Sequence, residues 1–194
     1  MKLLYTKRSP FARKVRVIAL EKNISLDLID EDLQKKSQCL LESNPLGKVP
    51  TLILDQGETV FDSAVICQYI DDLNDKAIMI PRQARERMEV LKWEAFADDL
   101  MVAAINLYME KTRHPQDFNK DFCSTLEKNI TLAYGYTAKN LSKLESFNLA
   151  AIAVASAIGY IHFRLPHLKV QGALSQWFEE ISKRPSMVQT IPVM

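Results

Sequence analysis

The sequence predicts a mixed α/β amino-terminal region followed by an all-helical carboxyl-terminal region. Short apolar runs of the strand type alternate with helical patterns early in the chain, but none recurs after Ile80. From that point long amphipathic helical patterns follow one another. A chain of 194 residues can bury a sizeable core, either as one large domain or as two small ones that share an interface.

The elements of the first region have the order β-α-β, a short helix, then β-β-α. Strands are predicted at 2–5, 26–30, 49–55 and 58–62, and helices at 11–23 and 63–74. The first three elements have the length that a right-handed βαβ unit requires. A turn around Gln56-Gly57 joins the last two strands, which predicts a hairpin.

The second region contains four helical patterns. They run over 83–113, 118–143, 148–163 and 170–183, with breaks at His114-Pro115, near Ser146 and at Pro166. The segment "NDKAIMIP" closes the mixed region and ends on a proline of the kind that starts helices. We therefore predict domains at 1–76 and 83–194, with 77–82 as the linker.

Composition excludes several classes of protein. The 25 Lys and Arg residues are spread along the chain and nearly balance 24 acidic residues, so no basic stripe predicts a nucleic-acid partner. The sequence has no apolar stretch long enough for a membrane span or for a signal peptide. We therefore expect a cytoplasmic protein. Cys39, Cys67 and Cys123 are widely spaced and predict reduced thiols. Because His162 and His167 lack metal-ligand spacing, no metal site is expected.

Three short stretches place polar residues or prolines at points where a ligand can bind. Pro50 directly precedes a predicted strand, a position that tolerates a residue without an amide hydrogen. Asp62 and Ser63 begin a helical pattern, where they can cap the helix, bind an anion, or do both. Ser9 lies just ahead of a helix that Pro10 favours, so it can serve as a simple cap or face a ligand.

Four stretches, "SPFARKVRV", "NPLGKVPTL", "FDSAVICQYI" and "FNLAAIAVASAIGYI", occur in an order and spacing that resemble the glutathione transferases. The serine-proline start is most similar to that of bacterial members, and the resemblance covers nearly the whole chain. It implies a thioredoxin-like amino-terminal domain that binds glutathione. It also implies an all-α carboxyl-terminal domain that shapes the site for an electrophile, and a homodimer.

The resemblance assigns glutathione contacts to the "GKVPTL" stretch. It implies a cis peptide bond between Val49 and Pro50, which turns the Val49 backbone outward to pair with glutathione as an added strand would. It also implies a lysine that faces the glycyl carboxylate. Lys48 and Lys36 are the candidates for this contact, with Lys35 as the alternative to Lys36.

The same resemblance assigns Ser63 to the γ-glutamyl carboxylate, Asp62 to the neighbouring ammonium, and Ser9 to the glutathione sulfur. Serine is no base near neutral pH, but its hydroxyl can donate a hydrogen bond to a thiolate. Lowering a thiol pKa by two units requires about 2.7 kcal/mol. Such a bond supplies roughly 1.5–3 kcal/mol and a helix end roughly 0.3–1 kcal/mol, so Ser9 suffices as the catalytic residue. Tyr5 and Thr6 are the other possible donors.

A stripe on the first long helix is open to two interpretations. Met101, Ala104, Ile105 and Tyr108 recur at helical spacing, which is typical of a core face, although part of the stripe can line an apolar pocket for a second substrate. Phe11 is a further candidate for that pocket, and for the glutathione site beside it.

The sequence therefore predicts a glutathione transferase that joins the glutathione thiolate to a small apolar electrophile. Glutathione is the co-substrate, and no permanently bound cofactor is implied. A glutathione-dependent reductase or peroxidase is an alternative, although a cysteine in place of Ser9 would suit that chemistry better. A ligand carrier or a protein-interaction module on the same fold also remains possible, because fold does not determine function.

Overall fold

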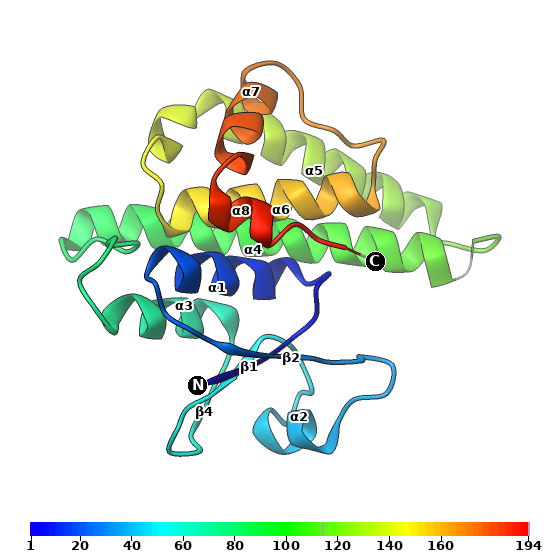
Figure 1. The fold of residues 1–194 in the computed structure, drawn as a ribbon. Coiled ribbons are helices and arrows are strands. Elements are labelled where there is room, and N and C mark those ends of the chain that lie inside the picture. Colours follow the sequence, from blue (N-terminus) through cyan, green and yellow to red (C-terminus); the bar gives the residue numbers. More distant parts are fainter. Residues whose placement is uncertain (114, 194) are drawn as a thin grey trace.

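The computed structural model describes residues 1–113 and 115–193, so His114 of the predicted break lies outside the described residues (Figure 1). The strands are β1 (Lys2–Tyr5), β2 (Asp27–Asp30), β3 (Thr51–Ile53) and β4 (Thr59–Val60). The helices among them are α1 (Pro10–Glu21), α2 (Gln38–Ser43) and α3 (Ser63–Asp72). The later helices are α4 (Ala84–Arg113), α5 (Lys120–Lys139), the 3₁₀ helix η1 (Leu141–Leu144), α6 (Leu149–Arg164), α7 (Gly172–Ser182) and α8 (Pro185–Gln189).

The four strands form one mixed sheet in the order β2-β1-β3-β4. β1 is parallel to β2 and antiparallel to β3, and β3 and β4 form the predicted hairpin. Figure 1 shows α1 and α3 between the sheet and the helical half, while α2 lies on the far side of the sheet. The structure therefore confirms the predicted fold class, a thioredoxin-like region followed by an all-helical region.

Helix α1 is the element that joins the two halves. Its side chain Arg13 is buried and donates to the Met187 carbonyl (3.2 Å) and to Thr190 Oγ1 (3.4 Å), which ties α1 to the end of the chain. Burial and the nearby charge of Arg16 lower the pKa of Arg13 to about 10. A Cβ atom at Gly159 would overlap Nη1 of Arg13, so the glycine leaves room for the Arg13 side chain against α6.

Helix α6 forms the centre of the helical half. Its first ten residues are buried and mostly small or aliphatic, as expected for a helix surrounded by others. Asn148 caps it, since its Oδ1 accepts the amide hydrogens of Ala150 (3.0 Å) and Ala151 (3.3 Å). Helices α4 and α1 pack against it (Figure 1).

The structure differs from the prediction at two places in this half. The helix predicted at 118–143 is interrupted at Asn140, whose amide donates to the Thr137 carbonyl while its side chain donates to the Tyr136 carbonyl. η1 is therefore a separate element. Helix α8 was not predicted, because its five residues are too short to show a helical period.

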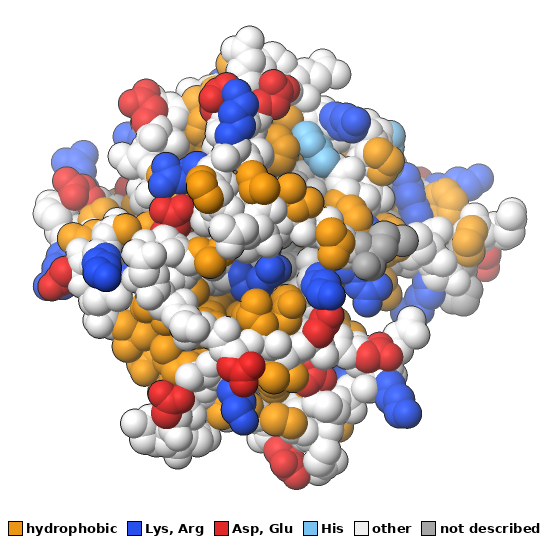
Figure 2. Space-filling view, viewed as in Figure 1, with side chains coloured by type: hydrophobic (Ala, Val, Ile, Leu, Met, Phe, Trp, Pro, Cys, Tyr) orange, Lys and Arg blue, Asp and Glu red, His pale blue; other side chains and the backbone are white. Residues whose placement is uncertain are grey.

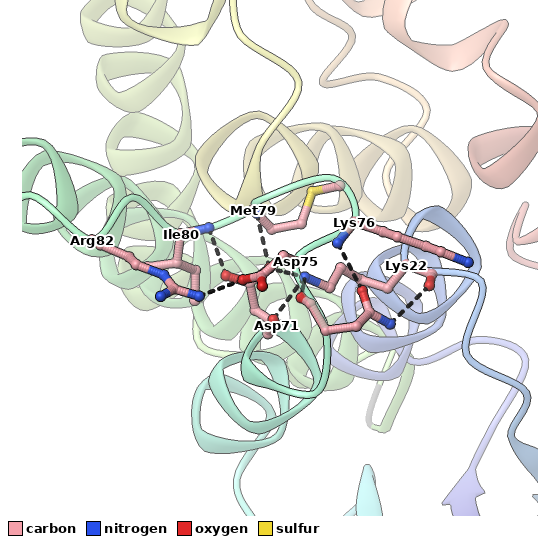
Figure 3. Close-up of polar contacts among 8 residues, drawn as sticks. Lys22, Asp71, Asp75, Lys76, Met79, Ile80 and Arg82 are labelled. Atoms are coloured by element: carbon pink, nitrogen blue, oxygen red, sulfur yellow. Dashed lines mark hydrogen bonds and ion pairs between the residues drawn. The ribbon is translucent and has the colours of Figure 1, made fainter.

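A buried polar network fixes the start of the connection between the two halves (Figure 3). Lys22 Nζ, at the end of α1, donates to the Asp71 carbonyl (2.7 Å), to Asp71 Oδ1 (3.0 Å) and to the Asn74 carbonyl (2.5 Å). The Asp71 carboxylate also accepts the amide hydrogens of Met79 (2.9 Å) and Ile80 (3.0 Å). These bonds link α1, α3 and the segment that leads to α4.

The structure describes residues 1–113 and 115–193, so statements about membrane spans and metal sites concern these residues only. Within these ranges no helix is both long and apolar enough to cross a membrane, and no cluster of possible metal ligands occurs. All three cysteines are free: Cys39 is exposed, while Cys67 and Cys123 are buried. His162 has a structural contact, because its Nε2 accepts the Val170 amide hydrogen (3.1 Å).

Candidate functional site

Ser9 is the capping residue at the amino-terminal end of α1. Its Oγ accepts the Ala12 amide hydrogen (3.2 Å), and its own amide donates to the Thr6 carbonyl and to Thr6 Oγ1 (both 3.2 Å). A hydroxyl that accepts one hydrogen bond keeps its own hydrogen to donate. Because Ser9 is half-exposed, this hydrogen is available to a ligand at the positive end of the helix.

The other two candidate donors are less accessible than Ser9. Tyr5 is buried in β1, and the Arg16 guanidinium lies 5.0 Å from the centre of its ring. Thr6 is buried too, and its hydroxyl orients the Ser9 amide. The contact of Thr6 with Ser9 was not predicted from the sequence.

The corner before β3 leaves a peptide backbone open. The Val49-Pro50 bond is cis, as the resemblance implied. The preceding carbonyl, of Lys48, accepts hydrogen bonds from Asn44 Nδ2 (3.1 Å) and Thr51 Oγ1 (2.9 Å). In the described part of the chain, neither the amide nor the carbonyl of Val49 has a hydrogen-bond partner. An extended ligand can therefore pair with Val49.

Asn44 and Thr51 are positioning residues that sequence analysis missed. Both are buried, and Asn44 Nδ2 also donates to Thr51 Oγ1 (3.1 Å). The asparagine in "NPLGK" was visible as part of a motif, but its reach to a carbonyl four residues later was not. The two side chains hold the corner in the shape that presents Val49.

At the start of α3, one residue caps the helix and the next offers its hydroxyl to a ligand. Asp62 caps the helix through Oδ1, which accepts the Ala64 amide hydrogen (3.1 Å). Ser63 is the first helical residue and is only 2% exposed. Its hydroxyl has no hydrogen-bond partner among the described residues. Since Asp62 already acts as the cap, the Ser63 hydroxyl is left for a ligand.

The three candidate lysines are exposed and lie close to this corner in sequence. Lys36 comes closest to the loop, since its Nζ lies 2.8 Å from the position that a Cβ of Gly47 would occupy. Gly47 has a φ of +54°, which favours glycine. Lys36 therefore lies across the same loop that carries Lys48. Lys35 shows no such contact.

The candidate residues for a second substrate fall into two groups. Met101 and Ala104 are fully buried in the hydrophobic core, which fits the core interpretation of their stripe. Phe11 and Tyr108 are half-buried at the edge of that core. Ile105 of the same stripe is half-buried too, so Phe11, Ile105 and Tyr108 have surface to offer a ligand.

A buried ion cluster lies between α1 and α4. Lys14 Nζ donates to Glu94 Oε1 (2.8 Å) and to both oxygens of Asp98 (2.7 Å each). Burial raises the pKa of Glu94 and of Asp98, with Lys14 acting in the opposite direction and Asp62 adding to the rise. Burial also raises the pKa of the Cys67 thiol, well above its usual range. The cluster holds α1 against α4, and no local pattern in the sequence indicates that its members meet.

The comparison with known proteins agrees with the fold. Residues 3–77 match the family model for the amino-terminal domain of glutathione S-transferases. Over 168 residues the chain is 36% identical to an Escherichia coli (strain K12) protein named "Uncharacterized GST-like protein YibF". That alignment covers 84% of this chain and 83% of the relative. The chain belongs to the glutathione S-transferase family.

Solved structures resemble the whole chain. A glutathione S-transferase from Methylobacillus flagellatus KT, with glutathione bound, has a TM-score of 0.93 at 36% identity and covers 99% of both chains. A glutathione transferase family member from Pseudomonas fluorescens Pf-5, also with glutathione bound, has a TM-score of 0.91 at 33% identity. It covers 100% of this chain and 99% of that one. The Pseudomonas protein was also solved with S-(propanoic acid)-glutathione, with a TM-score of 0.87.

Proposed function

We propose that this protein binds glutathione and joins it, through its sulfur, to an electrophilic carbon of a small second substrate. The observation that carries the proposal is Ser9, whose hydroxyl hydrogen is available at the start of a helix. The proposal assigns glutathione to a domain of residues 1–76 and the second substrate to a domain of residues 83–194, with 77–82 as linker. Glutathione is the co-substrate, and no permanently bound cofactor is needed.

The proposal assigns four contacts to glutathione. The open backbone of Val49 pairs with the peptide, and the hydroxyl of Ser63 together with the amides of α3 receives the γ-glutamyl carboxylate. Asp62 meets the ammonium group, and Lys36 or Lys48 faces the glycyl carboxylate. The glutathione that the Methylobacillus and Pseudomonas relatives bind supports the same assignment for this chain.

The chemistry of the transfer follows from Ser9. Its hydroxyl donates to the sulfur, the helix end adds positive potential, and the thiol proton passes to solvent. The thiolate then forms a bond to the electrophilic carbon, and a leaving group departs with the electron pair of the bond that breaks. With an aryl chloride the products are the thioether, chloride and a proton.

The cysteines favour this reaction over thiol-disulfide chemistry. A glutathione-dependent reductase needs an accessible thiolate beside the bound sulfur. Position 9 is a serine, and Cys67 is buried with its pKa raised. Cys39 is exposed, but it lies on α2, on the other side of the sheet from α1 (Figure 1). Turnover of chlorodinitrobenzene would distinguish a transferase from a ligand carrier or an interaction module, neither of which turns over substrate.

The glutathione site is tested by Ser63→Ala. We expect this variant to bind glutathione about tenfold or more weakly, because a hydrogen bond to a charged group is worth roughly 1.5–3 kcal/mol. Isothermal calorimetry measures the affinity, and thermal unfolding checks that the fold is intact. Ser175→Ala, which removes a hydroxyl from α7, is the matched control and should bind normally. Unchanged affinity in Ser63→Ala would argue against an anion site at α3.

We further propose a homodimer formed through the outer face of α3 and α4. Arg87 Nη2 of α4 donates to Gln68 Oε1 of α3 (2.7 Å), which sets the two helices side by side. Val65 and Met88 are exposed near this contact, each with about half of its surface accessible. An apolar hollow of about 530 Å³ lies along α4. It is lined by Ala84, Arg87, Met88, Leu91 and Lys92. Together with the family resemblance, this surface supports a second copy as the partner.

Sedimentation velocity tests the dimer. We expect the parent protein to sediment at twice the mass of one chain, and the double variant Val65→Asp, Met88→Glu to sediment as a single chain. Charges buried at an interface without partners are strongly unfavourable. Val188→Asp places a charge on an exposed apolar position of α8 and should leave the dimer intact. A monomeric parent would refute the proposal.

A further inference from the structure

Tyr108, a candidate for the second-substrate pocket, is held by an arginine. Arg164, at the end of α6, donates from Nη1 to the Tyr108 hydroxyl oxygen (3.2 Å). The guanidinium carbon of Arg164 lies 4.6 Å from the centre of the Tyr108 ring and 4.5 Å from that of Phe163. Because the Tyr108 oxygen accepts from Arg164, its own hydrogen points elsewhere and can be donated to a ligand.

This pair lies at the same end of the molecule as Ser9. Helices α1 and α6 run in opposite directions (Figure 1), and the Arg13 side chain of α1 lies against Gly159 of α6. Ser9 precedes Arg13 by four residues, which is about 6 Å along α1. Arg164 follows Gly159 by five residues, which is about 7.5 Å along α6. Since the helices are antiparallel, both steps lead toward the same end. Arg164 and its partner Tyr108 therefore lie toward the same end of the molecule as Ser9.

A second arginine lies at this end. Arg8 is exposed and directly precedes Ser9, and no ion pair to it occurs within residues 1–113 and 115–193. Burial raises the pKa of the Tyr160 phenol, and the charges of Arg164 and Arg8 both act against that rise. The two guanidinium groups thus act on one side chain. Figure 2 shows Lys and Arg side chains gathered over α1 and beyond its amino-terminal end.

We propose that the second substrate carries a carboxylate, which Arg8 and the Tyr108 hydroxyl bind while Arg164 positions Tyr108. This inference rests on the proposed transferase function and replaces the wholly apolar electrophile that the sequence predicted. A carboxylate only accepts hydrogen bonds, and arginine and phenol are strong donors to it. The half-buried ring of Phe11 supplies the apolar contact for the rest of the substrate.

The test compares two glutathione conjugates that differ in one group, S-(propanoic acid)-glutathione and the uncharged S-propylglutathione. Calorimetry at low salt gives the affinity of glutathione and of each conjugate. We expect the parent protein to prefer the acid about tenfold or more, since hydrogen bonds to charged groups are worth roughly 1.5–3 kcal/mol. Arg8→Gln and Tyr108→Phe should each reduce this preference severalfold, and Tyr108→Phe keeps the ring that Arg164 contacts.

Lys7→Gln is the matched control, because Lys7 is the neighbouring exposed cation but faces Asp30 (3.6 Å). It should keep the full preference for the acid. If the parent protein binds glutathione but has equal affinity for the two conjugates, this inference alone is overturned. The same holds if Arg8→Gln keeps the full preference for the acid. Failure of glutathione and of both conjugates to bind would overturn the proposed function, and this inference with it.

Discussion

Ser9→Ala should slow the transfer of glutathione by about one to two orders of magnitude near neutral pH while retaining most of the glutathione affinity. The peptide contacts lie at Val49 and Ser63, so binding does not depend on the Ser9 hydroxyl. Loss of that hydroxyl removes a donor worth roughly 1.5–3 kcal/mol to a thiolate, and the pKa of the bound thiol should rise. The rate deficit should therefore shrink as the pH is raised.

Two measurements check this mechanism. Ultraviolet absorbance of the thiolate, titrated with glutathione bound, gives the thiol pKa, and the pH profile of turnover should shift by the same amount. Ser9 is also a helix cap, so its loss costs about 1 kcal/mol of stability. Asn119→Ala removes an equivalent cap from α5 and should leave the thiol pKa unchanged. If Ser9→Ala matched the parent in thiol pKa and rate, Ser9 would not be the activating group.

The elements predicted from the sequence were those specified by local patterns. Pro10 after a capping serine marked the start of α1, and Asp62 marked the start of α3, because caps and helical periods act over a few residues. The β3-β4 hairpin was visible for the same reason, with its turn at Gly57, whose φ is +93°. The cis bond before Pro50 came from the family resemblance and not from local pattern.

The parts that could not be predicted depend on contacts between distant residues. Lys14 meets Glu94 across 80 positions of sequence, and no periodicity in either helix specifies that pairing. The stripe that contains Met101 identified one face of α4, but spacing alone does not reveal whether a helix or a ligand covers that face. Arg164 was overlooked because it reaches Tyr108 only when α6 and α4 are packed together.

The second large effect is expected at Asp71, in the network of Figure 3. Asp71→Ala should lower the free energy of unfolding by about 3–5 kcal/mol, as breaking one partner of a buried ion pair does. It leaves Lys22, which is 1% exposed, with only the carbonyls of Asp71 and Asn74. It also removes the acceptor for the amides of Met79 and Ile80, so the segment that leads to α4 loses its anchor.

Asp75→Ala is the matched control, since it removes the same side chain four residues later. Asp75 pairs with Arg82, but the two side chains are 83% and 78% exposed. Exposed pairs contribute about 0–1 kcal/mol, so this variant should unfold at nearly the urea concentration of the parent. Because Asp71 links α1, α3 and the start of the helical half, its loss should also broaden the single urea transition as the two halves begin to unfold separately. Equal midpoints for Asp71→Ala and Asp75→Ala would show that the buried network adds no more stability than an exposed ion pair.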